Sequence, residues 1–169
     1  MASWLNLTGV EQDFDLLSKF GLIPGTDSTL VYPEPDVTSG RYSLEFFVHG
    51  VRHMRNEAPE WCKTALAGTR LLAMLDVQNP VDHNAVAIRP EEKNFLLGYV
   101  PSFYASDFRT ILSDPRSLET ARITVLKCNN DAPPQLRLLC RFEATVPQTF
   151  RALDTESHQP LQLPLLRAL

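Results

Sequence analysis

The sequence predicts a mainly β fold: a small, partly closed barrel with two or three short helices. About six short apolar segments have the length and composition of strands, and turn residues separate them. Only two segments between them carry the start and stop signals of a helix. With 169 residues, of which 44% are hydrophobic, the chain is long enough for one domain with extensions.

The strands are expected where β-branched and aromatic residues form short runs. In chain order these runs cover residues 44–51, 70–77, 85–89, 95–100, 121–127 and 136–144. A helix is expected over residues 59–67, because Pro59 suits a first helical turn and Gly68 suits a helix end. A second helix is expected over residues 102–112, with Ser102 as its cap.

The two ends of the chain differ from this middle region. Residues 8–20 predict an amphipathic helix that either packs on the protein's own core or binds a partner. Residues 24–40, rich in Pro, Gly, Asp, Ser and Thr, predict a connector. The Leu-rich end of the chain either covers a sheet edge or binds a partner. We therefore expect an acidic leader with one helix and a connector over 1–40, a barrel over 41–147 and a Pro/Leu-rich tail over 148–169.

The acidic charge is concentrated in the leader. The net charge of the chain is −4, yet residues 1–40 carry one basic and six acidic side chains, while the rest carries 15 basic and 14 acidic ones. A near-neutral barrel lacks the broad basic surface of a protein that coats a duplex. It still has enough basic side chains to bind one or two phosphates.

The cysteines and the absence of targeting signals indicate an intracellular protein, cytoplasmic if bacterial. Cys62, Cys128 and Cys140 are odd in number and form no CxxC pair, as expected of reduced thiols. No apolar run approaches the ~20 residues of a membrane helix, and the first residues lack the layout of a secretion signal. We expect no membrane partner.

Residues 79–100 are the most informative segment, because they place a polar turn between two apolar strands. Pro80 fixes its own φ and favours an extended Asn79, while Asp82 and Asn84 are short enough to bond nearby backbone amides. The turn is expected to hold Asp82 at the mouth of the sheet. Its carboxylate has two interpretations: it closes the turn onto backbone amides, or it accepts a donor from a ligand.

The sequence contains no recognisable catalytic motif. It has no Gly-x-x-x-x-Gly-Lys-Ser/Thr loop, no Gly-x-Ser-x-Gly elbow and no His-Glu-x-x-His pair, so we expect neither an enzyme nor a cofactor. His49, His53, His83 and Cys62 are possible zinc ligands, but their spacing is loose. We expect them to be scattered surface or core residues without a metal.

Three motifs occur in a defined order: Gly50-Val51-Arg52-His53, Asn79-Pro80-Val81-Asp82-His83-Asn84-Ala85-Val86 and Gly98-Tyr99-Val100-Pro101. Over residues 44–146 this pattern resembles the HIRAN domain, a module of fork-remodelling Swi/Snf-class translocases that also occurs in bacterial proteins. The resemblance implies an OB-like barrel. It also implies a module that recognises single-stranded DNA at its 3′ end for a DNA-processing or repair system.

The resemblance assigns a role to each motif residue. Asp82 would accept a hydrogen bond from the 3′-hydroxyl, Arg52 would face a phosphate or base, and Tyr99 would lie near the same pocket. The family usually has an aromatic residue after this arginine and another before this aspartate. The present chain has His53 and Val81 at those positions. The replacement of the aromatic residue before the aspartate by Val81 removes a stacking surface and is expected to lower the affinity for DNA.

Each DNA-binding assignment has an alternative in the residues themselves. Arg52 has Glu57 and Glu60 nearby in sequence as ion-pair partners, His53 suits an exposed loop, and Tyr99 suits a half-buried strand. If these alternatives hold, the barrel is a protein-interaction module that has lost DNA binding. Its partner would then contact the leader helix or the Leu-rich tail.

Overall fold

The computed structural model describes residues 32–55 and 57–159 of the chain. The helix predicted over residues 8–20 and the Leu-rich residues 160–169 lie outside these ranges. The described strands are β1 (Asp36–Thr38), β2 (Arg41–Phe47), β3 (Arg70–Leu75), β4 (Val86–Pro90), β5 (Gly98–Tyr99), β6 (Arg122–Cys128) and β7 (Leu138–Thr145). The helices are α2 (Glu57–Thr64), α3 (Ser102–Ser113) and α4 (Pro115–Thr120), with 3-10 turns η2 (Val51–His53), η3 (Pro134–Leu136) and η4 (Glu156–His158).

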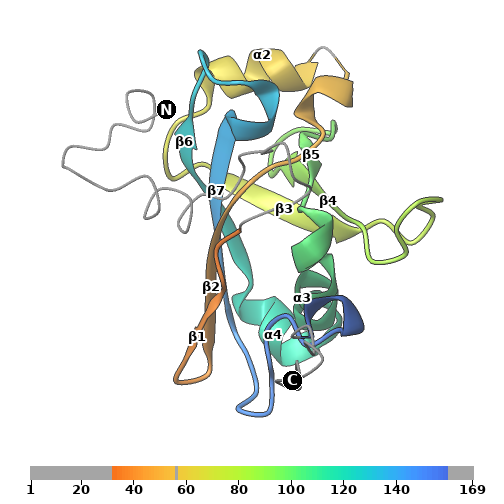
Figure 1. Cartoon of the computed structure of the whole chain (residues 1–169). Coiled ribbons are helices and arrows are strands. Elements are labelled where there is room, and N and C mark those ends of the chain that lie inside the picture. Colours follow the sequence, from red (N-terminus) through yellow and green to blue (C-terminus); the bar gives the residue numbers. More distant parts are fainter. Residues whose placement is uncertain (1–31, 56, 160–169) are drawn as a thin grey trace, which may run out of the picture.

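All seven described strands belong to one sheet, in the order β1-β2-β7-β6-β3-β4-β5, and every neighbouring pair is antiparallel (Figure 1). β2 pairs with β7 along its whole length, from Arg41 opposite Thr145 to Phe47 opposite Leu139. The helices lie at the two ends of this strongly bent sheet (Figure 1). The prediction of a mainly β fold with short helices is confirmed.

The sheet closes partly on itself, because its last strand returns to the end of β2. His49 and Tyr99 exchange two backbone hydrogen bonds, each with an N–O distance of 2.9 Å. The prediction of a partly closed barrel is therefore confirmed. The strand expected to run to residue 51 ends at Phe47, because Gly50 adopts a left-handed conformation (φ 77°) that turns the chain into η2.

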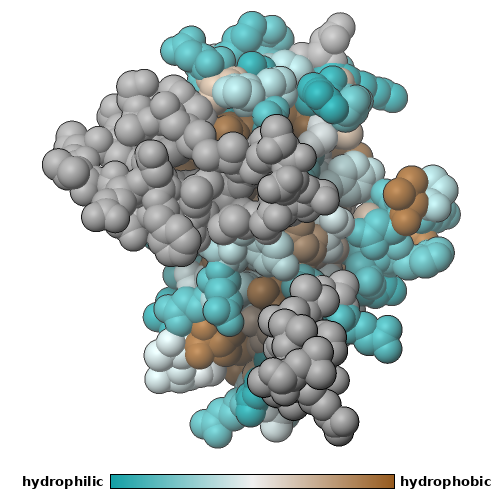
Figure 2. Space-filling model, in the orientation of Figure 1, coloured by the Kyte–Doolittle hydropathy of each residue, from teal (hydrophilic) through white to brown (hydrophobic). Residues whose placement is uncertain are grey.

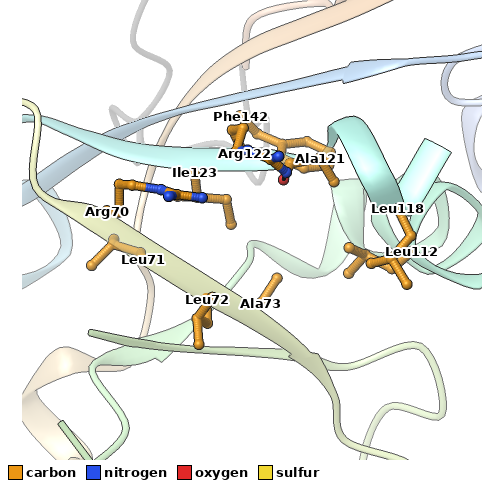
Figure 3. Close-up of a pocket in the computed structure, with 10 residues that line it drawn as sticks. All are labelled: Arg70, Leu71, Leu72, Ala73, Leu112, Leu118, Ala121, Arg122, Ile123 and Phe142. Carbon is orange, nitrogen blue, oxygen red and sulfur yellow. Dashed lines mark hydrogen bonds between the residues drawn. The ribbon is translucent and has the colours of Figure 1, made fainter. Parts of the chain in front are cut away.

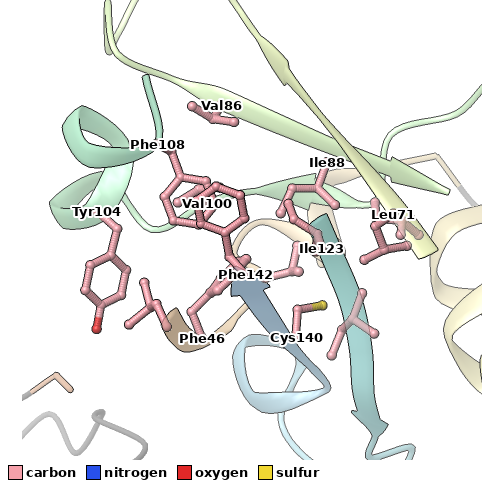
Figure 4. Close-up of a cluster of buried hydrophobic side chains, with 14 of the residues drawn as sticks. Phe46, Leu71, Val86, Ile88, Val100, Tyr104, Phe108, Ile123, Cys140 and Phe142 are labelled. Carbon is pink, nitrogen blue, oxygen red and sulfur yellow. The ribbon is translucent and has the colours of Figure 1, made fainter. Parts of the chain in front are cut away.

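Aromatic side chains fill the interior of the barrel (Figure 4). Alternate residues of the strands point inward, and α3 covers them with its apolar face. The ring of Phe108 from α3 stacks on Phe142 from β7, with centroids 4.1 Å apart, and meets Phe46 from β2 edge-on at 5.3 Å. This cluster joins the helix to both long strands, so the barrel and α3 form one core.

Three elements differ from the prediction in their turns and ends. α2 covers Glu57–Thr64 rather than 59–67, so Pro59 is its third residue and Gly68 lies four residues beyond its end. β1 lies in the segment expected to be a connector, and it pairs with β2 through a two-residue turn in which Ser39 and Gly40 both have positive φ. The expected cap Ser102 is instead the first residue of α3, and Pro101 precedes it without a side-chain cap. α4 follows directly, and its cap Asp114 accepts a hydrogen bond from the backbone N–H of Ser117 at 2.9 Å.

The segments that lead into and out of the barrel meet beside the first turns of α3. Tyr32 stacks on Phe103 with a centroid distance of 4.3 Å, and its ring meets His158 edge-on at 6.2 Å. The hydroxyl of Tyr104 donates to the carbonyl of Pro33 at 2.6 Å. Residues on both sides of the predicted barrel boundaries therefore contact the barrel, while the division into three domains stays a prediction.

Asp107 is a buried carboxylate that joins the outgoing segment to α3. Only 4% of its surface is exposed. Its oxygens accept from the backbone N–H of Leu153 at 3.0 and 3.1 Å and from the hydroxyl of Tyr42 at 3.3 Å. Burial raises its pKa above the ordinary value of 3.8, and the hydrogen bonds from Leu153 and Tyr42 oppose that rise.

The raised pKa of Asp107 predicts a pH-dependent stability. Between the unfolded and the folded pKa the native state binds more protons, so this residue's contribution to stability is larger at low pH and falls as pH rises. Asp107→Asn keeps one acceptor oxygen for these donors and removes the titration. We expect it to be at least as stable as wild type at pH 7 and to lose that advantage near pH 4, measured by urea unfolding at each pH.

The control for this measurement is Asp107→Ala, which removes the buried acceptor altogether. It leaves the N–H of Leu153 and the hydroxyl of Tyr42 without this partner and is expected to cost ~1 to 3 kcal/mol. An Asn variant whose stability difference from wild type is the same at both pH values would contradict the assignment.

Candidate nucleic-acid interface

The loop between β3 and β4 is held in one shape by its own side chains. The Oδ1 atom of Asn79 accepts from the backbone N–H groups of Val81 and Asp82, both at 3.0 Å. Asp82 in turn accepts through Oδ1 from the N–H of Asn84 at 2.8 Å. The predicted turn-closing role of Asp82 is therefore confirmed. Within the described ranges, no donor bonds its second carboxylate oxygen.

Tyr99 ties this loop to the far strand of the sheet. Its hydroxyl donates to Oδ2 of Asp76 at 3.0 Å, and the same oxygen accepts from the side-chain amide of Asn79 at 3.2 Å. Since β4 separates β5 from β3, the tyrosine ring crosses β4 at its pairing partner Ala87, whose small side chain is buried. Burial raises the pKa of Tyr99, and the bond to Asp76 adds to the effect.

Arg52 and His53 lie on η2, beside the end of β5. The Nε atom of Arg52 donates to Nε2 of His53 at 2.9 Å. Both residues line an open hollow of about 420 Å³ together with His49, and residues Pro134 and Gln135 of η3 form its other wall. Burial of His49 lowers its pKa, so the neutral ring is favoured at this position.

The ion pairs considered for Arg52 do not form. Among the described residues its guanidinium bonds only His53, and Glu60 instead accepts from Lys63 at 2.6 Å. Glu57 makes no ion pair among these residues. His53 is exposed, as the surface interpretation expected, and Tyr99 is half-buried. The charge of Arg52 is therefore exposed at the rim of the hollow.

One outward-facing row connects the loop to η2. The partners in register are Met74 on β3, Ala87 on β4, Tyr99 on β5 and His49 after β2. Their chain neighbours point into the core, so the row itself faces outward. With neighbouring strands about 4.8 Å apart, the row is roughly 14 Å wide. The structure thus joins Asp82 and Tyr99 through one hydrogen-bonded loop, and it places Arg52 and His53 at the opposite end of the row.

Several residues of this face are absent from the sequence-based assignment. Asp76 and Asn79 hold the loop, and Arg109 of α3 donates to the carbonyl of His83 at 2.8 Å. The Asn-Pro dipeptide is a turn signal that points to Asn79, whereas nothing local indicates Asp76 or Arg109. The loop exposes two apolar side chains: Val77 is 69% and Val81 91% exposed. The loop between β3 and β4 is the protrusion at the right of Figure 1, and Figure 2 shows hydrophobic atoms on that protrusion.

Metal ligation and membrane insertion find no support in the part of the chain that the structure describes. There, no group of three or more His, Cys, Asp and Glu side chains is arranged to hold a metal ion. No helix within residues 32–55 and 57–159 is long and apolar enough to cross a bilayer.

One family model and two solved structures are similar to this chain. A family model described as the HIRAN domain matches residues 41–147. Among solved structures, the HIRAN domain of human HLTF is similar at 16% identity and a TM-score of 0.48, with 66% of this chain and 84% of that chain covered. A structural-genomics protein from Lactobacillus plantarum (target LpR91B) is similar at 16% identity and a TM-score of 0.45, with 62% and 97% covered. No curated protein matches.

Proposed function

Because the chain belongs to the HIRAN domain family of DNA-end-binding modules, we propose that it binds single-stranded DNA and recognises the 3′ end. The HIRAN domain is a binding module rather than a catalytic one. The present chain would serve a DNA-processing or repair system and act alongside a helicase or another DNA-processing enzyme. The observation that supports the proposal is the outward row from Met74 to His49, which contains Tyr99 of the third motif. The second motif follows Met74 in the chain, and the first motif follows His49 directly.

Asp82 is the residue assigned to the terminal hydroxyl. One of its oxygens is used by the N–H of Asn84, and the loop around it is braced by Asn79. The second oxygen is therefore held in place without a donor from the described residues. A site that is already ordered loses little conformational entropy when the ligand binds. A hydroxyl donor suits this oxygen, whereas a terminal phosphate brings like charge against it.

Arg52 is assigned to a phosphate of the same strand. Its guanidinium is exposed and has no carboxylate partner among the described residues. A guanidinium can form two parallel hydrogen bonds to one phosphate. The ring of Tyr99 belongs to the row itself, and His53 follows Arg52 on η2. Both rings are assigned to stack on bases.

The first test compares oligonucleotides that differ only at their ends, by fluorescence anisotropy. We expect a 3′-hydroxyl strand to bind more tightly than a 3′-phosphate strand, and the same change at the 5′ end to have little effect. Asp82→Ala should weaken binding of the hydroxyl strand by ~1 to 3 kcal/mol and erase the preference. Asp82→Asn removes the charge but keeps an oxygen that can accept from the N–H of Asn84. Comparing it with Asp82→Ala separates the effect of the charge from the effect of the loop's shape.

Two further variants serve as comparison in the same assay. Arg52→Ala should weaken binding of both strands and reduce the log–log salt slope by about 0.7, as expected for one single-strand phosphate contact. Glu119→Ala, on the exposed surface of α4, should change nothing. Equal affinity for both 3′ chemistries would overturn the assignment of Asp82.

A gain of affinity is predicted at Val81, which occupies the position of a family aromatic. Its side chain is 91% exposed, in a loop whose backbone is held by the side chain of Asn79. An aromatic ring therefore fits at this position without disturbing the core. Val81→Tyr is expected to tighten binding of a 3′-hydroxyl strand about tenfold, since one stacked base contributes ~1 to 3 kcal/mol. Val37→Tyr on β1, at the far end of the sheet, is the matched control and should leave affinity unchanged. No gain at position 81 would place the DNA path elsewhere.

A protein-interaction module is the second candidate. The exposed side chains of Val77 and Val81 favour it, because apolar side chains held out in solvent often mark a contact with another protein. In this alternative a partner contacts the barrel, the leader helix or the Leu-rich tail. Absence of any oligonucleotide binding at low salt would favour this candidate over the first.

A further inference from the structure

The barrel has an open seam between β3 and β6. The two strands pair only at Arg70 opposite Thr124 and Leu71 opposite Ile123, and then they diverge. β3 continues to Leu75 with β4 on its other side, so its edge from Leu72 onward has no strand partner at the seam among the described residues. The ends of α3 and α4 border the gap, which forms a groove of about 190 Å³ (Figure 3).

The groove has an apolar floor and a basic rim. Leu72, Ala73 and Leu112 line it together with Leu118, which is 50% exposed. A cavity of ~150 Å³ holds a benzene molecule, so a groove of this size admits one aromatic side chain. It is therefore a place for one anchor residue of another segment.

Arg70 and Arg122 are the charged side chains of the groove (Figure 3). Arg122 donates to the carbonyl of Ala121 and has no carboxylate partner in the described part of the chain. Arg70 reaches Glu91 only at 3.8 Å, at the limit of an ion pair. Two guanidinium groups beside an apolar groove favour an acidic segment with an apolar anchor.

We propose that the acidic leader segment, residues 8–20, docks in this groove with Phe14 as its anchor. Phe14 is flanked directly by Asp13 and Asp15, and Glu11 lies three residues earlier in the sequence. In a helix the two neighbours of a residue project to its two sides, so an aspartate lies on either side of the ring. This pattern matches an apolar groove with Arg70 and Arg122 at its edges.

The chain outside the described ranges is long enough for this contact. The leader enters the described structure at Tyr32, which stacks on Phe103 at the first turn of α3. Leu112 lies nine residues further along the same helix, roughly 13.5 Å away at 1.5 Å per residue. Residues 21–31 alone span up to about 35 Å when extended.

The Leu-rich tail is the competing occupant, and its charge argues against it. Residues 160–169 contain no acidic side chain, and their one charged side chain is Arg167, which has the same sign as the rim of the groove. The leader has an apolar anchor and the complementary charge, whereas the tail has apolar side chains without that charge.

Photocrosslinking in the full-length protein tests the proposal. With p-benzoylphenylalanine in place of Phe14, irradiation and mass spectrometry should identify intramolecular crosslinks to peptides that contain Leu112 or Leu118. Arg122→Glu should reduce the crosslink yield on the order of tenfold, equivalent to about 1.4 kcal/mol. Adding Asp15→Arg to Arg122→Glu should restore it. Arg116→Glu, an exposed residue of α4 that does not line the groove, is the matched control and should have no effect.

Three results would overturn the proposal. The first is a crosslink from position 14 to another part of the barrel. The second is a crosslink between two copies of the chain, which would make the groove an interface of a dimer. The third is a groove crosslink from the same photoreactive residue at position 165, in the tail, together with none from position 14. Urea unfolding of Arg122→Glu and of Arg116→Glu shows whether both variants remain folded.

Discussion

Replacing Gly98 by alanine is expected to open the barrel. A Cβ atom at this position would lie 2.2 Å from the carbonyl oxygen of His49 and 2.8 Å from Cγ1 of Val48. The first contact is with backbone, which cannot rotate away, and the φ of 150° at Gly98 is one that other residues rarely adopt. The substitution would therefore separate β5 from His49 and break the pairing that closes the sheet.

We expect Gly98→Ala to lower the free energy of unfolding by about 3 kcal/mol or more, measured by urea denaturation. The matched control is Gly68→Ala. Gly68 has a φ of 85° and nothing within 4 Å of an added Cβ, so this variant should lose only about 1 kcal/mol from backbone strain. Oligonucleotide binding should be lost in the first variant and kept in the second. Equal stability of the two variants would show that the closing pair contributes little.

A fragment of residues 39–149 is expected to be much less stable than one of residues 32–159. The shorter fragment lacks β1, the carbonyl that Tyr104 bonds, and the N–H group of Leu153 that Asp107 accepts from. It also lacks Tyr32 and Phe150, two aromatic side chains that pack on the core. Full burial of such a side chain contributes ~1.5 to 3 kcal/mol, so the loss of these two partly buried rings is at most about 6 kcal/mol.

Thermal and urea unfolding of the two fragments provide the measurement. Neither fragment contains the leader helix or residues 160–169, so the comparison isolates the flanking contacts. A cooperative transition at the same temperature in both fragments would mean that residues 41–147 are sufficient for the fold. That result would support the predicted domain limits without change.

The individual strands were predictable because their signals are local. Runs of β-branched and aromatic residues place β3, β4, β6 and β7 within two residues of their observed bounds, whereas β2 begins and ends three to four residues earlier than expected. β1 was not predictable in this way: its three residues are all exposed, so no alternation marks it. The closure between His49 and Tyr99 was expected only as a general property of a barrel, because the pairing partner of a strand depends on tertiary structure.

The candidate site also contains some bonds that local sequence predicts and others that depend on tertiary structure. The turn-closing bond of Asp82 follows from a short polar side chain beside proline, and it spans two residues. The bond from Tyr99 to Asp76 spans 23 residues and depends on which strands are neighbours, so no local pattern predicts it. For Arg52, sequence neighbours suggested a carboxylate partner, whereas the turn at Gly50 places it beside His53 instead.

The meeting of the two flanking segments beside α3 determines how the domain responds to tension. Because Tyr32 and His158 are in edge-on ring contact, a pull applied through both flanking segments loads that contact before it loads the sheet. The hydrogen bonds between the strands do not carry this force while the contact between Tyr32 and His158 holds. Tension on both flanking segments would therefore peel away Tyr32 and η4 first, while the face that carries Asp82 and Arg52 keeps its shape.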